Sequence, residues 1–223
     1  MRGAFVAVAL LAGVALRLAA QEDVATRLDR RVPPAVVREV EELASSAVAR
    51  GLPVEPLIQK AIEGGAKGVP AERVIAAVRA LAARLEAAAG ALRSSGIESP
   101  AADVIEGGAY ALGAGLSADE VAELARSSHE PHDPGLTLRV AATLAALGVP
   151  PKTTLELVRD MIRAGRAPND ILSLPAQVQA GMARGATPAQ AAQGLGRAAA
   201  HRPPGRPPDR IPPGQAKPKP HKP

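Results

Sequence analysis

The sequence predicts an all-α protein, an irregular array of short antiparallel helices that forms either an α-solenoid-like helical repeat or a bundle. Two features of residues 33–199 indicate this class. Apolar residues recur three and four positions apart, the spacing that places them on one face of a helix, and the alternation typical of strands is absent. Glycines followed closely by Pro, Ser or Thr separate the apolar stretches. This order is typical of one helix ending and the next beginning.

Taken in chain order, five segments have the pattern of a helix. Residues 38–50 begin with a charged stretch, Arg38 with Glu39, Glu41 and Glu42, which indicates an amphipathic helix with a solvated face. Residues 70–95 keep one apolar face over their whole length, through Val74, Ile75, Val78, Leu81, Leu85 and Leu92. Shorter apolar faces follow around residues 121–124, 136–147 and 155–162.

Seven connections between these segments share one pattern. They begin at Gly51, Gly68, Gly96, Gly115, Gly148, Gly165 and Gly185. In each we expect the glycine to take the left-handed conformation that ends a helix and the next residue to fold back on the last turn. Pro, Ser or Thr is then expected to open the following helix, with a capping box between Ser117 and Glu120. Such tight turns predict that successive helices are antiparallel or steeply crossed.

The sequence also contains a short duplication. The pentapeptide Ile-Glu-Gly-Gly-Ala occurs at residues 62–66 and again at residues 105–109, and a weaker third copy occurs at residues 178–181. The first two copies are 43 residues apart, and repeats of about that length built from helix pairs are typical of α-solenoids and irregular helical-repeat bundles. The distances between the seven connecting glycines are uneven, however, so both an open solenoid and a closed bundle fit the sequence.

Residues 1–20 have the layout of a secretory signal peptide: Arg2, an apolar run over residues 3–16, and small residues up to Ala20. The run is shorter than the roughly 20 residues that span a bilayer. We expect cleavage after Ala20 and export to the periplasm or the exterior of a bacterium. The alternative is a retained N-terminal anchor, which Arg17 favours because a charge is unusual so close to a cleavage position. The absence of Cys fits a bacterial envelope protein.

The positive charge of the chain lies at its two ends. Residues 201–223 have a net charge of +5 and nine of the 22 prolines, whereas residues 21–200 have a net charge of −2. The terminal segment is predicted to be a disordered basic tail with a polyproline II preference. The predicted domains are thus a signal peptide (1–20), an all-α helical-repeat domain (21–200) and the tail (201–223). The folded domain lacks the charge of a nucleic-acid-binding protein.

Composition excludes several kinds of site. Without Cys the chain has no disulfide, no thiol nucleophile and no Cys-ligated zinc. Tyr110 is the only aromatic residue beyond the predicted leader, so recognition by several stacked aromatic rings is excluded. We expect Tyr110 in the core or in a groove with its hydroxyl at the edge.

One cluster has the side chains of a metal site. His129, Glu130, His132 and Asp133 are the ligand types that zinc and other divalent ions use. The spacing of the two histidines and the proline between them differ from the zincin pattern. Asp133 also has a local role as the N-cap of a helix beginning at Pro134. We therefore expect a polar surface loop, with a metal site as the alternative.

No catalytic residue or cofactor is assigned. Glu63 and Glu106, which share the repeated pentapeptide, are expected to face solvent, because acid–base catalysis needs a pocket and the sequence shows no sign of one.

These observations predict an exported, non-enzymatic helical-repeat protein that binds another protein or itself as an interaction or structural module of the cell envelope. The expected binding surface is the groove of the repeats near Tyr110. One alternative is an adaptor whose basic tail binds an anionic envelope polymer or membrane surface. The other is a metal-dependent enzyme that uses the loop around His129 and His132.

Overall fold

The computed structural model describes residues 24–201, and over these residues the chain is all-α, as predicted. The predicted signal peptide and all of the predicted tail after His201 lie outside the described residues. After a helical turn at residues 24–28, the helices are α2 (Pro34–Ala49), α3 (Glu55–Ala66), α4 (Ala71–Ser94), α5 (Ala102–Gly113), α6 (Ala118–Ser127), α7 (Pro134–Ala146), α8 (Pro151–Arg163), α9 (Pro168–Leu172), α10 (Leu174–Ala183) and α11 (Pro188–His201).

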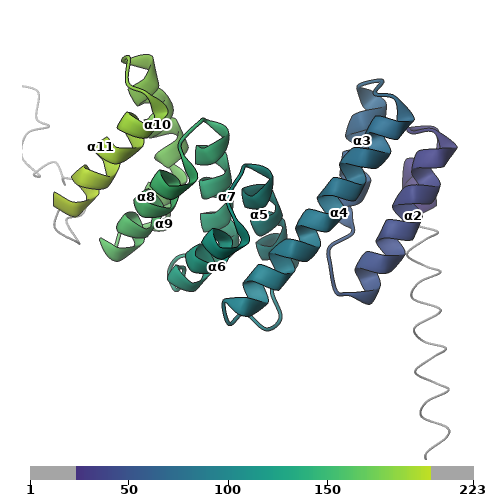
Figure 1. Ribbon diagram of the computed structural model, residues 1–223, viewed down its shortest axis with the longest axis horizontal. Coiled ribbons are helices and arrows are strands. Elements are labelled where there is room, and N and C mark those ends of the chain that lie inside the picture. Colours follow the sequence, from purple (N-terminus) through teal and green to yellow (C-terminus); the bar gives the residue numbers. More distant parts are fainter. Residues whose placement is uncertain (1–23, 202–223) are drawn as a thin grey trace, which may run out of the picture.

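The helices form an elongated row, from α2 at one end to α11 at the other (Figure 1). The main contacts join helices no more than three apart in chain order, and the most extensive ones are between α5 and α7 and between α4 and α5. The long helix α4 links the α2–α3 end to the rest of the molecule. None of the described helices has both the length and the apolar character needed to cross a membrane.

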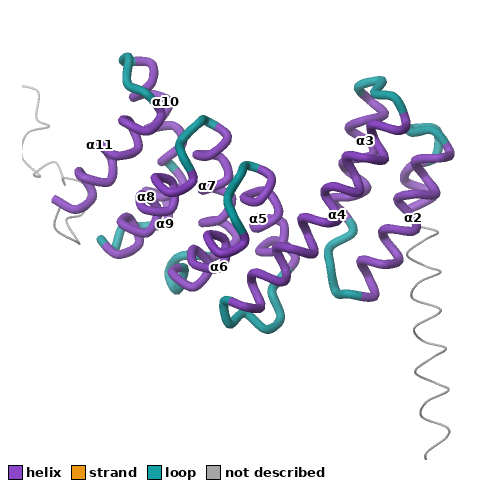
Figure 2. The backbone as a smooth tube through the Cα atoms, viewed as in Figure 1, coloured by secondary structure: helices purple, strands orange, loops and turns teal. Residues whose placement is uncertain are grey.

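All seven predicted connecting glycines have positive φ. Gly115, with φ of +100°, is representative. Its N–H donates to the carbonyl oxygen of Leu112 (3.1 Å), and the N–H of Leu116 donates to that of Ala111 (3.1 Å). The same two bonds recur at the six other glycines, so each of these helices ends in a Schellman motif. The loops that follow are short (Figure 2).

The starts of the helices vary more than predicted. Ser117 forms the predicted capping box with Glu120. Prolines open α9 and α11, but Pro70 is the N-cap of α4, with φ −51° and ψ 141°. Proline suits that position because its ring fixes φ and an N-cap has extended ψ. Pro53 and Pro100 lie two residues before the first helical residue.

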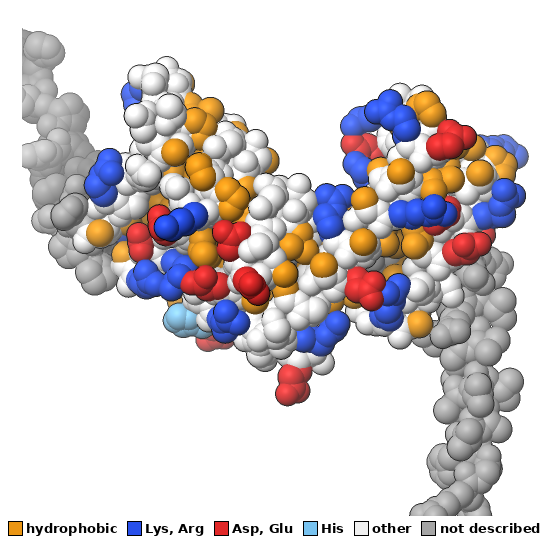
Figure 3. Space-filling view, in the orientation of Figure 1, with side chains coloured by type: hydrophobic (Ala, Val, Ile, Leu, Met, Phe, Trp, Pro, Cys, Tyr) orange, Lys and Arg blue, Asp and Glu red, His pale blue; other side chains and the backbone are white. Residues whose placement is uncertain are grey.

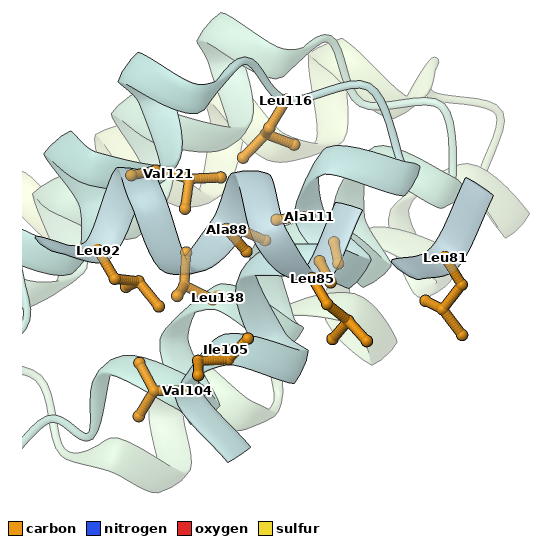
Figure 4. Packing of buried hydrophobic residues seen from close by; sticks show 14 of the residues in the cluster. Leu81, Leu85, Ala88, Leu92, Val104, Ile105, Ala111, Leu116, Val121 and Leu138 are labelled. Carbon is orange, nitrogen blue, oxygen red and sulfur yellow. The ribbon is translucent and has the colours of Figure 1, made fainter. Parts of the chain in front are cut away.

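The core is a continuous cluster of small and medium apolar side chains. The predicted face of α4 is buried, except for Ile75, which is partly buried. Figure 4 shows Leu85 and Leu92 of α4 in one cluster with residues of the next three helices, among them Ile105, Val121 and Leu138. Alanine supplies many of the other buried positions, so helices approach closely while each contact removes little apolar area from water.

The second copy of the repeated pentapeptide lies where α5 is packed between two other helices. A Cβ at Gly107 would stand 2.7 Å from the carbonyl oxygen of Gly135 in α7. A Cβ at Gly108 would stand 3.0 Å from the Cβ of Ala88 in α4. Gly107 therefore lets α5 contact the later helix α7, and Gly108 lets it contact the earlier helix α4.

The first copy has the same arrangement. A Cβ at Gly64 would stand 2.6 Å from Cγ2 of Val74 in α4, and a Cβ at Gly65 would overlap the carbonyl oxygen of Arg31 before α2. The duplicated letters thus mark two equivalent packing positions, each in contact with the elements before and after its own helix.

We predict that Gly107→Ala lowers the free energy of unfolding by about 1–3 kcal/mol, because the added methyl group forces α5 and α7 apart. The matched control is Gly90→Ala in α4, where the Cβ position has no atom within 4 Å. Alanine there should raise stability by about 0.5–1 kcal/mol, since glycine is unfavourable inside a helix. Denaturant unfolding of the two variants measures both effects. Similar changes in the free energy of unfolding of Gly107→Ala and Gly90→Ala would contradict the close approach at Gly107.

Candidate functional site

A groove of about 950 Å³ is lined by α3, α4, α5 and α7. In the space-filling view the outline is indented between α3 and α5, above α4 (Figure 3). Its apolar lining consists of small residues of α5, its C-cap and α7, together with one leucine of α4 and one proline of α3, namely Leu81, Pro56, Ala109, Gly113, Ala114, Ala142 and Ala146. Small side chains on α5 and α7 leave space that larger ones would fill.

Tyr110 lines this groove and is 50% exposed. Of the two locations expected for it, the groove is therefore the one observed. Its hydroxyl forms no hydrogen bond with any residue in the 24–201 range. Tyrosine is a common anchor in protein interfaces because it combines a large apolar ring with one polar atom.

Two of the carboxylates in the groove are held by basic side chains. Glu55 accepts hydrogen bonds from Arg27 through both oxygens (2.6 Å each) and from the amide of Gln59 (2.7 Å). These bonds, with the one from Arg27 the most important, lower the pKa of Glu55 to about 2. Glu63 is bonded by Lys67 and by Lys60, and they lower its pKa to about 2. Both carboxylates are therefore ionised at neutral pH, which does not suit a general acid.

Glu63 faces solvent, as expected, whereas Glu106 is partly buried, and the groove beside them was not expected. Both line the groove, Glu63 exposed and Glu106 with 24% of its side chain exposed. Glu106 lies 3.5 Å from Arg139 of α7. The sequence did not reveal the groove because its walls come from helices that are distant in the chain.

Arg84 of α4 is the groove residue that sequence reasoning missed entirely. Its Nε donates to the carbonyl oxygen of Ala80 (3.2 Å), and no carboxylate of residues 24–201 forms an ion pair with it. Its Nη1 lies 2.5 Å from the place that a Cβ of Gly113 would occupy. Gly113 and Tyr110 are three residues apart and share a face of α5. The guanidinium thus lies beside the part of α5 that carries the exposed tyrosine.

The four residues proposed as metal ligands do not form one cluster. His132 is buried, at 5% exposure, and its Nε2 donates to the carbonyl oxygen of Arg166 (2.7 Å). Asp133 accepts a hydrogen bond from the N–H of Leu136 (2.7 Å) and is the N-cap of α7, as predicted. His129 and Glu130 are exposed, and Nδ1 of His129 lies 3.0 Å from the carbonyl oxygen of Ser127.

Within the described residues, no three or more His, Cys, Asp or Glu side chains are grouped so that they could hold a metal ion. The loop also differs from the polar surface loop that was expected, because His132 points inward and links it to the turn between α8 and α9. A hydrogen bond across 34 positions of the chain leaves no local signal in the sequence.

We predict that His132→Ala lowers the free energy of unfolding by about 1–3 kcal/mol, since it removes the buried hydrogen bond that His132 donates to the carbonyl oxygen of Arg166. The matched control, His129→Ala in the same loop, should change stability by less than about 0.5 kcal/mol. Thermal unfolding with and without zinc tests the metal alternative in the same samples. A zinc-induced rise in Tm that both variants abolish would favour a metal site over the structural role.

The pair between Arg27 and Glu55 should make stability depend on pH. A carboxyl group whose pKa is lower in the folded chain than its usual value of 4.5 stabilises the fold above pH 4.5. That contribution, about 1 kcal/mol or less for an exposed pair, should be lost as the pH falls from 4.5 towards 2. The free energies of unfolding of the unmodified chain and of Glu55→Gln, measured with denaturant, should therefore differ at pH 6, and the difference should shrink as the pH falls towards 2. Arg27→Met should behave as Glu55→Gln does, and a constant difference at every pH would contradict the assignment.

Comparison of the chain with known protein families, with curated proteins and with solved structures gives no match. A function for this protein must therefore be inferred from the groove and its side chains.

Proposed function

We propose that this protein is an exported, non-enzymatic helical-repeat module that binds a segment of another protein in the groove between α3 and α7. The observation that carries the proposal is the half-exposed Tyr110 in a groove of about 950 Å³. A large aromatic side chain in a concave surface is the feature most often found at the energetic centre of a protein interface. The role would be interaction or structural support in a bacterial envelope.

The lining of the groove supports binding rather than catalysis. No His, Cys, Ser or Asp is among its lining residues in the described chain. Of the other side chains that can act as nucleophiles or bases, Lys60 is bonded to Glu63 (2.9 Å), and the hydroxyl of Thr143 donates to the carbonyl oxygen of Arg139 (2.8 Å). The two glutamates with lowered pKa, Glu55 and Glu63, are already neutralised by basic side chains. What remains available to a ligand is an aromatic ring, small apolar side chains and basic groups.

The row-like arrangement of the helices also suits this function. Since the main contacts of each helix are with near neighbours in the chain, no distant helix folds over the groove. Open rows of this kind are how helical-repeat proteins present extended concave surfaces. The two repeated pentapeptides, which occupy equivalent packing positions in α3 and α5, support the repeat interpretation.

The export part of the proposal depends on residues 1–20, and the alternative of a tail-driven adaptor depends on the net charge of +5 in residues 201–223. The two modes of binding differ in their response to salt. Contacts of the basic tail with an anionic polymer weaken as salt rises, whereas an aromatic anchor in a groove is much less sensitive.

Envelope extract is passed over the full chain, Tyr110→Ala, Leu172→Ala and the chain ending at residue 200, each at low and high salt. We predict that Tyr110→Ala reduces the retained partner at least about tenfold, the effect of losing ~1.4 kcal/mol of binding energy. Leu172→Ala is the matched control, because Leu172 is 47% exposed and does not line the groove. Equal retention by Tyr110→Ala and the unmodified chain would refute groove binding. Retention that requires the residues after 200, and that high salt abolishes, would support the adaptor.

A further inference from the structure

We infer that the segment bound in the groove carries a carboxylate that pairs with Arg84, next to an apolar side chain that packs on Tyr110. This inference rests on the proposed function and adds the chemistry of the partner. It names an acidic peptide segment as the ligand, rather than a basic segment or a nucleic acid.

Arg84 has hydrogen-bond donors that the fold does not use. Arg84 is partly buried as a residue, and within residues 24–201 its guanidinium is bonded only to a backbone carbonyl, that of Ala80. No ion pair joins it to a carboxylate within residues 24–201, whereas the other arginine of the groove, Arg139, faces Glu106. A guanidinium has five donors arranged to match the two oxygens of a carboxylate. Most of the donors of Arg84 thus remain available to a ligand.

Arg84 is the base of the groove lining that has no acidic partner among the described residues. Three bases (Lys60, Arg84 and Arg139) and three carboxylates (Glu55, Glu63 and Glu106) line the groove. Each carboxylate lies against a basic side chain of the groove or its rim, whereas no carboxylate of the described residues forms an ion pair with Arg84. A carboxylate placed beside Arg84 is therefore attracted, and a basic side chain placed there is repelled.

The groove suits a peptide better than a nucleic acid. Tyr110 is the single aromatic side chain of the groove, so successive bases of a strand cannot stack there. A peptide needs only one carboxylate at Arg84 and an apolar contact at Tyr110. Because Arg84 contacts α5 at Gly113, one helical turn from Tyr110, neighbouring side chains of one segment can reach both.

The experiment begins with selection of random twelve-residue peptides on the full chain. Enriched peptides are synthesised with acetylated N-termini and amidated C-termini, and their affinities are measured by fluorescence anisotropy. A parallel set with free C-termini distinguishes a side-chain carboxylate from a terminal one. The proteins compared are the unmodified chain, Arg84→Met, Arg84→Glu, Tyr110→Ala and Arg93→Met. Arg93→Met is the matched control, since Arg93 is an exposed arginine nine residues further along α4, on the opposite face.

We expect the enriched peptides to share Asp or Glu and to bind Arg84→Met at least about tenfold more weakly, while Arg93→Met binds as the unmodified chain does. Replacing the shared acid by its amide should weaken binding to the unmodified chain to a similar extent. With Arg84→Met the same replacement should cause no further loss of affinity. Arg84→Glu should bind the peptide whose acid is replaced by Lys. This swap of charge preference is not expected if Arg84 only supports the fold.

Two results would overturn the inference, and they have different meanings. Peptides that require Tyr110 but bind Arg84→Met with unchanged affinity would refute the pairing with Arg84 and leave groove binding intact. A selection that yields no peptide dependent on Tyr110 would refute the groove as a binding site and the inference with it. Melting temperatures of all variants identify any loss that comes from unfolding.

Discussion

The left-handed glycine at the end of a helix is the constraint on which the rest of this structure depends. A residue with a Cβ resists that conformation by about 1–2 kcal/mol, so glycine fixes the point at which each of seven helices stops. The two hydrogen bonds of the Schellman motif then direct the chain back across the helix end. Because the next helix begins within a few residues, its position relative to the previous helix is set locally. A row of helices, each packed on its near neighbours, results from repeating that step.

Close packing of small residues complements the turns. Gly107 and Gly108 let α5 contact α7 and α4 at distances that any larger side chain would prevent. The same preference for Ala and Gly on outward faces of α5 and α7 leaves the groove unfilled. The residues that permit tight helix contacts on one side therefore leave open space on the other. Ion pairs between elements, such as that of Arg50 at the end of α2 with Glu86 of α4, are largely exposed and add little to stability.

The site was predictable only in part. Tyr110 stood out because it is the single aromatic residue of the described chain, and a groove was one of its two expected positions. Asp133 was identified as an N-cap from its neighbours alone, since capping involves residues three apart. Arg84 gave no signal, because an arginine on a helix surface is ordinary until the neighbouring helix brings Gly113 against it. The buried position of His132 was missed for the same reason, as its partner Arg166 is 34 residues away.

The sequence by itself determined the fold class, the seven helix ends and two of the helix caps. These features depend on interactions within about six residues, so their signals are contained in short stretches of sequence. Tertiary structure decided which faces enclose the groove, that Glu63 and Glu106 both line it, and that Arg84 lacks a carboxylate partner among residues 24–201. These outcomes depend on the angles at which helices cross, and each angle is the joint result of side-chain packing between segments far apart in the chain. No short stretch of sequence contains this information, so the site can be identified only from the assembled helices.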